Sequence, residues 1–269
     1  MPTGSENGHG RALALDARGL GKTYQLGQLQ DVQRAAGRLL RRGQQPPPRK
    51  PFMALDDVSF QVARGDGFAM LGSNGSGKST LVQIMSGISV PTEGSLTVRG
   101  RVLPLLEVGA GFHPELTGRE NVTLFGTILG LSDEEIESAM PHISQFGGID
   151  EEHMDTPIKR FSMGMQARLS FAVAMRFPAD IYIFDEVMAV VDDHFRGVAM
   201  SEIKHLMERG KTVVFISHDL DLVRELCSHG IWLDGGKLRM SGPIDGLAEA
   251  YRRFQLAGLD SEEAEAAQV

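Results

Sequence analysis

The stretch from Gly72 to Thr80 constrains the fold of this chain more than any other. It reads Gly-Ser-Asn-Gly-Ser-Gly-Lys-Ser-Thr and fits the pattern G-x-x-x-x-G-K-[ST] at every position. The apolar residues 68–71 come just before it and predict a buried strand, and residues 80–85 follow with helical character. Strand, glycine-rich loop and helix form the context in which this motif binds phosphate.

The chemistry follows from the residue types in this loop. Glycines let the backbone curl until successive N–H groups face one concavity, and the next helix adds its positive N-terminal end. We expect the Lys78 ammonium to reach the β- and γ-phosphates of a nucleotide and the Ser79 hydroxyl to ligate Mg²⁺. The residues predicted to bind the nucleotide here are Gly72, Ser73, Asn74, Gly75, Ser76, Gly77, Lys78, Ser79 and Thr80.

A second stretch with phosphate chemistry is Ile-Tyr-Ile-Phe-Asp-Glu at 181–186. Four apolar residues predict a buried strand, and its carboxyl end, where ligands of open α/β sheets bind, carries two acids. Asp185 suits a Mg²⁺ ligand acting through the water shell of the ion. Glu186 suits the catalytic residue that polarises an attacking water. Many strands end in an acid, but the phosphate loop about a hundred residues earlier makes this pairing specific.

The composition excludes several classes of protein. Of 269 residues, 42% are hydrophobic and 23% charged, as in ordinary globular domains. No apolar run approaches the roughly 18 residues of a membrane span, and residues 1–10 lack the apolar core of a signal peptide. A single cysteine, Cys227, cannot form an internal disulfide and favours a reducing cytoplasm. The net charge of −8 argues against broad nucleic-acid binding.

The first two thirds of the chain mix strands with a helical region. Residues 1–10 are predicted to be a flexible tail. Apolar alternation predicts strands at 12–17 and 52–62, and two short strands within 96–106. The run Ser-Asp-Glu-Glu at 132–135 is a capping box that opens a helix. Residues 115–176 are therefore predicted to form a mainly helical subdomain.

In the last third of the chain, predicted strands and predicted helices alternate. The predicted strands and helices are 181–184, 194–209, 212–216, 220–227 and 231–233, in chain order. This alternation predicts an α/β fold with an open, largely parallel sheet. We expect one domain over 11–258, followed by an acidic, disordered tail at 259–269.

The composition shifts between residues 25 and 51. Apolar residues among arginines predict a short amphipathic helix, and Pro46-Pro47-Pro48 a stiff connector. The six cations opposed by a single acid, Asp31, are Arg34, Arg38, Arg41, Arg42, Arg49 and Lys50. This insertion is either a solvated surface loop or a contact for anionic lipid or a membrane partner.

Three further motifs follow the phosphate loop in a defined order. Residues 161–168 read Phe-Ser-Met-Gly-Met-Gln-Ala-Arg and resemble the signature motif of ABC ATPases, commonly L-S-G-G-Q, with Ser162 and Gly164 matching. Residues 216–219, Ile-Ser-His-Asp, resemble the switch-histidine loop of that family. Residues 187–192 occupy the place of its D-loop, with Asp192 matching. These motifs cover nearly the whole chain, which is thus similar to ABC ATPases.

The resemblance implies a fold and further site residues. The fold is that of a P-loop NTPase, with a mostly parallel sheet core, an antiparallel β subdomain and a helical subdomain. Tyr24 would stack on adenine, and His218 would meet the γ-phosphate as a catalytic residue. Ser162 and Gly164 would bind nucleotide held by a second copy. The match to the signature motif explains a serine at position 162 better than a role as a helix N-cap does.

The resemblance narrows to one group. Residues 105–121, with Phe-Ser-x-Gly-Met and Asp-Glu-Val-Met-Ala-Val, are similar to the ATP-binding subunits of bacterial polysaccharide exporters for O-antigen, capsule and teichoic acid. Met165 fits this group, whereas Met163 and Val191 stand where it usually has Ser and Gly. His113 replaces the usual Q-loop Gln and is either a metal-sensing residue or a loop histidine without a nucleotide contact. Some members add a carbohydrate-binding domain, which we do not expect here.

The implied mechanism is ATP-driven closure of a homodimer around two ATP molecules with Mg²⁺. A separate multi-span permease would then move a lipid-linked polysaccharide, with this chain peripheral at the cytoplasmic face of the cell (inner) membrane. A soluble ABC ATPase acting on nucleic acid or ribosomes is the alternative; the sequence has neither long coiled coils nor a second cassette, and its acidic charge disfavours nucleic acid. A P-loop kinase of small molecules is a third possibility, against which the signature motif argues.

Overall fold

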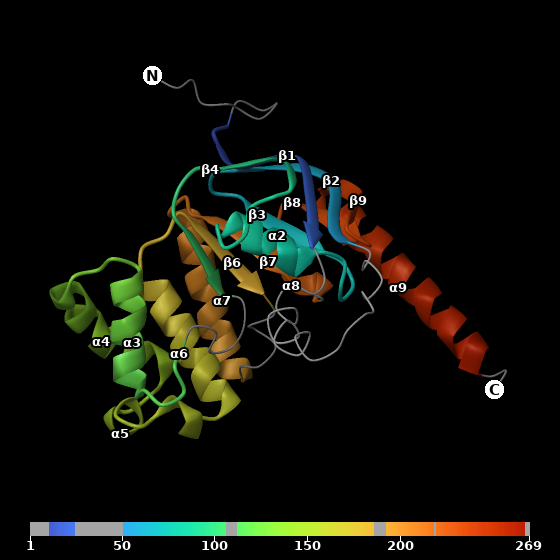
Figure 1. The fold of residues 1–269 in the computed structure, drawn as a ribbon. Helices are drawn as coiled ribbons and strands as arrows, with labels where there is room; N and C mark the ends of the chain where they lie inside the picture. The colour runs from blue at the N-terminus through green and yellow to red at the C-terminus, as the bar shows by residue number, and fades with distance from the viewer. Residues whose placement is uncertain (1–10, 25–50, 106–111, 186–191, 218, 267–269) are drawn as a thin grey trace, which may run out of the picture.

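A six-stranded sheet forms the centre of the molecule (Figure 1). The computed structural model describes residues 11–24, 51–105, 112–185, 192–217 and 219–266. The sheet has the order β5-β6-β7-β3-β8-β9 and comprises β3 (Gly67–Leu71), β5 (Val102–Leu105), β6 (Ile181–Asp185), β7 (Thr212–Ile216), β8 (His229–Asp234) and β9 (Lys237–Pro243). Strands β5 to β8 in this order are parallel, and only β9 pairs antiparallel. The prediction of a largely parallel sheet is therefore confirmed.

The central strand β3 is buried on both faces, which explains its unbroken apolar sequence. Phe68 and Met70 point into a core shared with the smaller sheet and with the helix α2 (Lys78–Met85). Ala69 and Leu71 point into a second core on the opposite face. The sheet thus separates two apolar layers, one on each face.

The smaller sheet is antiparallel and has the order β2-β1-β4. Its strands are β1 (Leu13–Tyr24), β2 (Phe52–Ala63) and β4 (Glu93–Val98). Leu15 of β1 pairs with Val62 on one side and Val98 on the other. This sheet and α2 cover one face of the larger sheet, which agrees with the predicted antiparallel subdomain.

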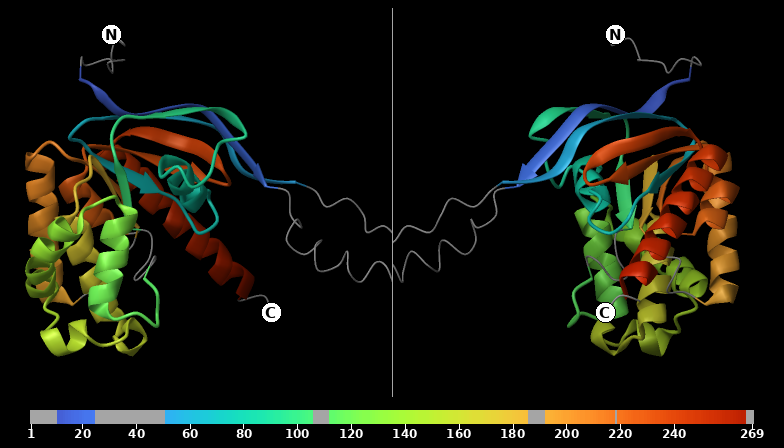
Figure 2. Two further views of the ribbon diagram at one scale, coloured as in Figure 1. Left: turned by 60° about the vertical axis from the view of Figure 1, so that its left-hand side comes forward. Right: turned by 90° about the vertical axis from the view of Figure 1, so that its right-hand side faces the viewer.

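Four helices cover the other face: α6 (Met163–Arg176), α7 (Asp193–Glu208), α8 (Leu220–Leu226) and α9 (Ile244–Ala266). Helix α6 also belongs to a helical lobe with α3 (Gly118–Ile128), α4 (Asp133–Gly147), α5 (Glu151–Met154) and the 3₁₀ turn Ile158–Arg160. The lobe has its own apolar core, which includes Val122, Ile143 and Leu169. Both views in Figure 2 place the lobe below the sheets, with the three-stranded sheet on top. In the part of the chain that the structure describes, no helix has the length and apolar character needed to cross a bilayer.

Most predicted elements are present, and two predictions need correction. Ser132 caps α4, and Glu135 returns the bond, as the capping box predicted. The strand predicted at 12–17 continues to Tyr24 through a bulge between Ala17 and Leu20, which broke the apolar alternation. Residues 259–266 extend α9 and are not a disordered tail; alanine and glutamate favour helix, so acidity alone was misleading. The predictions for 1–10, 25–50 and 267–269 lie outside the described residues.

Candidate nucleotide-binding site

The phosphate loop joins β3 to α2 and depends on glycine at defined positions. Gly72, Gly75 and Gly77 have φ of 152°, 79° and 105°, a region that other residues rarely adopt. A Cβ atom on Gly77 would lie 2.7 Å from the carbonyl oxygen of Ala54 in β2. The loop is therefore pressed against the smaller sheet, and only glycine fits there.

The loop leaves donors available to an anion. No side chain caps the N-terminus of α2, and the hydrogen bond from Leu81 N–H to the Gly77 carbonyl is the one that opens the helix, at 3.0 Å. The N–H groups of the first turn are thus outside the helical bonds, at the positive end of the helix dipole. The Lys78 ammonium donates to the carbonyls of Gly72 (2.5 Å) and Ser73 (2.9 Å), which keeps it over the loop.

A buried polar atom in the loop also has no partner within the described residues. Ser76 is 2% exposed, and its Oγ accepts and donates no hydrogen bond there. The Ser76 carbonyl accepts from Gly236 N–H at 3.1 Å, and the Gly236 carbonyl accepts from Asp56 N–H at 2.9 Å. The loop is therefore anchored to the β8–β9 turn and to β2. Its uncapped N–H groups and the ammonium beside them fit a phosphate group.

Strand register brings the predicted acid to the same edge of the sheet as the loop. Ile216 of β7 pairs with Met70 of β3 on one side and with Asp185 of β6 on the other. All three strands are parallel, so the Asp185 carboxyl end lies level with the start of the phosphate loop, with β7 between them. Glu186 and His218, the predicted catalytic residues, lie outside the described residues.

Tyr24 ends β1 and lies beside the helix that follows the loop. Its hydroxyl donates to Gln83 Oε1 of α2 at 3.3 Å, and Lys22 Nζ is 5.1 Å from its ring centroid. The structure thus brings Tyr24 to α2, the helix that begins with Lys78. Adenine stacking by this ring stays a prediction.

His113 is exposed, and an unpredicted residue fixes its backbone. The amide of Asn121 donates to the carbonyls of His113 (3.1 Å), Leu116 (3.0 Å) and Thr117 (2.9 Å), and its Oδ1 accepts from His113 N–H at 2.6 Å. Asn121 is buried, so these bonds hold the 113–117 turn against α3. The His113 ring itself accepts only a 3.3 Å bond from Glu115 N–H among the interactions of the described residues. Its proposed metal role stays a prediction.

The signature residues lie on a different layer. Ser162 is the N-cap of α6, and its hydroxyl accepts from Met165 N–H at 3.2 Å. The sequence favoured the signature motif over a helix cap for Ser162, and the structure shows that the hydroxyl does cap α6, as suits serine, which is among the best N-cap residues. Its contact with nucleotide stays a prediction. Helix α6 packs into the core opposite α2. Within one copy, α6, the helix that Ser162 caps, and α2, the helix that begins with Lys78, therefore pack on opposite faces of the sheet.

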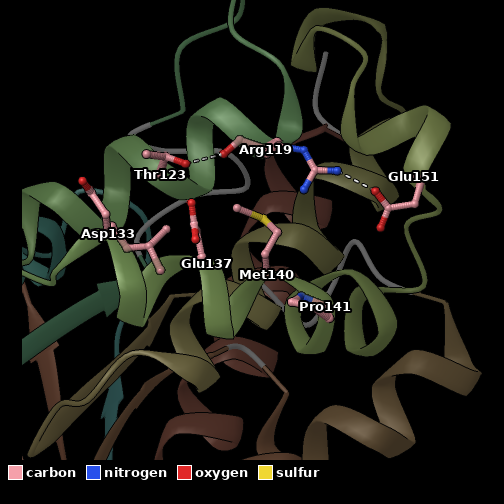
Figure 3. A pocket seen from close by; sticks show the side chains of 8 residues that line it. Arg119, Thr123, Asp133, Glu137, Met140, Pro141 and Glu151 are labelled. Atoms are coloured by element: carbon pink, nitrogen blue, oxygen red, sulfur yellow. Dashed lines mark hydrogen bonds and ion pairs between the residues drawn. The ribbon is translucent and has the colours of Figure 1, made fainter.

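The helical lobe carries a separate pocket of about 620 Å³ between α3, α4 and α5 (Figure 3). Arg119 crosses it to Glu151 at 2.5 Å and also meets Asp155 at 3.0 Å. Thr123, Asp133, Ile136, Glu137, Met140 and Pro141 complete the lining. None of the predicted site residues lines this pocket, so it is distinct from the phosphate loop.

The fold and the loop define a P-loop nucleotide-binding protein. A family model described as ABC transporter matches residues 55–189. The O-antigen export system ATP-binding protein RfbB of Klebsiella pneumoniae is 40% identical over 204 residues, 76% of this chain and 82% of that protein. The teichoic acids export ATP-binding protein TagH of Bacillus cereus is 35% identical over 201 residues, 75% of this chain and 36% of that protein. The chain belongs to the ABC transporter ATP-binding family.

Solved structures agree on the fold. A dimeric ATP-binding cassette in a post-hydrolysis state, bound to ADP and Pi, superposes with a TM-score of 0.69 at 23% identity. The match covers 86% of this chain and 98% of that structure. The predicted α/β fold of the P-loop NTPase type is therefore confirmed.

Proposed function

We propose that this chain binds and hydrolyses ATP to power the export of a lipid-linked polysaccharide across the cytoplasmic membrane. The observation that carries the proposal is the shared sheet edge, where strand register brings Asp185 level with the phosphate loop. The similarity to export ATP-binding proteins for O-antigen and teichoic acids supports the transport role.

Each site residue has a proposed role that suits the chemistry of its side chain. Lys78 would neutralise the β- and γ-phosphates, and Ser79 and Asp185 would hold Mg²⁺, which supplies positive charge to the phosphates when bound. Glu186 would accept the proton of the attacking water, and His218 would contact the γ-phosphate. Tyr24 would stack on the adenine base.

A second copy is needed to complete this site. Ser162 caps α6 and Gly164 lies in its first turn, and α6 packs on the face of the central sheet opposite α2, the helix that follows the phosphate loop. The N-terminus of α6 would instead meet nucleotide held by a partner copy, in an ATP-bridged homodimer. The Ser162 hydroxyl already caps α6, and a hydroxyl oxygen can accept that bond while donating to a phosphate.

The proposed partners are a multi-span permease and, through it, the lipid-linked glycan. The chain would then be peripheral, at the cytoplasmic face of the inner membrane. The alternative, an ABC ATPase acting on nucleic acid or ribosomes, finds less support because of the net charge of −8 and the exporter relatives.

The test is reconstitution of the chain with the permease in lipid vesicles. We expect the ATPase rate of the complex to rise when a lipid-linked polysaccharide is added, and to be unaffected by RNA or DNA. A complex with ribosomes, or stimulation by nucleic acid alone, would replace this proposal with the alternative.

A further inference from the structure

Two arginines connect three neighbouring helices by the same device. Each arginine contacts the aspartate that caps the next helix. Arg168 of α6 lies 3.8 Å from Asp192, the N-cap of α7. Arg196 of α7 pairs with Asp219, the N-cap of α8. The backbone N–H of Arg196 also donates to the backbone carbonyl of Asp192 at 2.9 Å. The contact of Asp192 with Arg168 and the contact of Arg196 with Asp219 therefore meet in the first turn of α7.

Asp219 uses its two carboxylate oxygens for different tasks. Oδ1 accepts from the N–H groups of Asp221 (3.1 Å) and Leu222 (3.0 Å), which caps α8. Oδ2 accepts from the guanidinium of Arg196. The Asp219 N–H in turn donates to Ser217 Oγ at 3.0 Å. Capping and the pairing with α7 can thus be separated by substitution.

The electrostatics of this carboxylate agree with its geometry. The backbone N–H of Leu222 is the main cause that lowers the pKa of Asp219, and hydrogen bonding to Arg196 lowers it further. The carboxylate is therefore ionised at neutral pH, and the contact with Arg196 is a charge-assisted one. Ser217 and Asp219, which are hydrogen-bonded to each other, are the two chain neighbours of His218.

We propose that Arg196 is a positioning residue for the switch histidine: by holding Asp219, the residue that follows His218 in the chain, it fixes that end of the segment relative to the start of α7. The inference rests on the proposed role of His218. It also connects the residue after His218 to the first turn of α7, which follows in sequence the segment that resembles the D-loop and ends at Asp192. Loss of the contact leaves nucleotide binding intact and misplaces the group that meets the γ-phosphate.

The chain provides a matched control in the same two helices. Lys204 of α7 pairs with Glu225 of α8 at 2.6 Å, further along both helices. The four side chains are all partly exposed, so each pair contributes little to stability. A general effect of joining α7 to α8 would appear equally in both pairs. A positioning effect would appear only at Arg196.

The experiment compares steady-state ATP hydrolysis by Arg196→Ala, Arg196→Lys, Asp219→Asn and Lys204→Ala with the wild type. Asn keeps an oxygen for the α8 cap but removes the charge that meets Arg196. We expect kcat to fall about 10- to 100-fold in Arg196→Ala and Asp219→Asn. The KM for ATP should change little, so kcat/KM falls in proportion. The double variant Arg196→Ala/Asp219→Asn should be no slower than either single variant, because both substitutions remove the same contact. Arg196→Lys should recover part of the rate.

The outcomes separate this inference from the function on which it rests. Wild-type kcat in Arg196→Ala, or a loss equal to that of Lys204→Ala, would overturn the positioning role. Additive losses in the double variant would overturn it as well. His218→Ala serves as the reference: if it hydrolyses ATP at the wild-type rate, the role proposed for His218 is wrong, whatever Arg196 does. Thermal unfolding of each variant identifies a misfolded protein, and Asp219→Asn tests the same contact independently of Arg196→Ala.

Discussion

Substituting alanine for Gly77 tests whether the phosphate loop is held against the smaller sheet. The control is Gly75→Ala in the same loop. Both glycines have positive φ, 105° and 79°, so alanine strains the backbone at either position. A Cβ atom on Gly75 meets nothing within 4 Å, whereas on Gly77 it meets Ala54 O at 2.7 Å and Leu55 Cδ2 at 2.9 Å. The two variants therefore differ mainly in this clash.

The expected magnitudes follow from these contacts. The left-handed backbone costs a non-glycine residue about 1–2 kcal/mol, which applies to both variants. Forcing a methyl group into packed structure costs roughly 1–3 kcal/mol more, and this applies to Gly77→Ala alone because a backbone carbonyl cannot rotate away. The loss of unfolded-state entropy from glycine to alanine is the same in both and cancels in the comparison.

The assay is urea unfolding without nucleotide, so that differences in ATP affinity do not contribute. We expect Gly77→Ala to lose more unfolding free energy than Gly75→Ala, with similar m-values. Equal midpoints for the two variants would refute the reasoning, since they would mean that the loop can move away from β2 without cost.

Three further predictions address the site, the smaller sheet and the insertion. Lys78→Ala should bind ATP very weakly in a calorimetric titration, because the cation that meets the phosphates is gone; unchanged affinity would remove the phosphate-loop assignment. The hydrogen bond from Arg18, the largest cause, lowers the pKa of the buried Asp16, so its contribution to stability is present above the unfolded-state value of about 4 and is lost as the pH falls through the lower folded value. Asp16→Asn should therefore destabilise the protein at pH 7 and reduce the loss of stability on acidification; an unchanged pH profile of thermal unfolding would contradict this. Reversal of the insertion's charges to glutamate at Arg38, Arg41 and Arg42 should weaken association with membranes that contain the permease while soluble ATPase activity persists, and undiminished association in a flotation assay would make the insertion a plain surface loop.

The sequence predicted best those features whose physical cause lies within one short stretch of residues. Buried parallel strands appear as continuous apolar runs, so β6 and β7 were predicted within a residue of their observed ends. The glycines of the phosphate loop likewise meet a local requirement, because Gly72, Gly75 and Gly77 all have positive φ, although the close approach of Gly77 to β2 is not visible in the sequence. Asp185 was identifiable because it ends such a strand.

The remainder depends on contacts between distant residues. Nothing local indicates that Asp185 and Met70 flank Ile216 at one level, since that is a matter of register. Asn121 escaped prediction because its four hydrogen bonds require the 113–117 turn to fold back on α3. Its only signal was a polar residue of low helix propensity at a position that the helical pattern buries.

The helix cap at Ser162 could also have been predicted from the local sequence. Ser162 directly precedes the helical run from Met163, which is the position an N-cap takes, but the family motif drew the interpretation away from this simpler reading. The structure reconciles the two, because a residue at the N-terminus of α6 both caps that helix and lies where helix N–H groups can meet an anion.

The Glu186→Gln variant tests most directly the claim that two copies share ATP. Gln keeps the size of the side chain but cannot act as a carboxylate base, so turnover should fall about 10²- to 10⁴-fold. Asp185 remains, so ATP should still bind and bridge the copies through Ser162. Size-exclusion chromatography with light scattering should then show a dimer with ATP and Mg²⁺ and a monomer without them, and adding Ser162→Arg should abolish the dimer. A Glu186→Gln protein that turns over ATP near the normal rate, or that stays monomeric with ATP and Mg²⁺, would contradict the account.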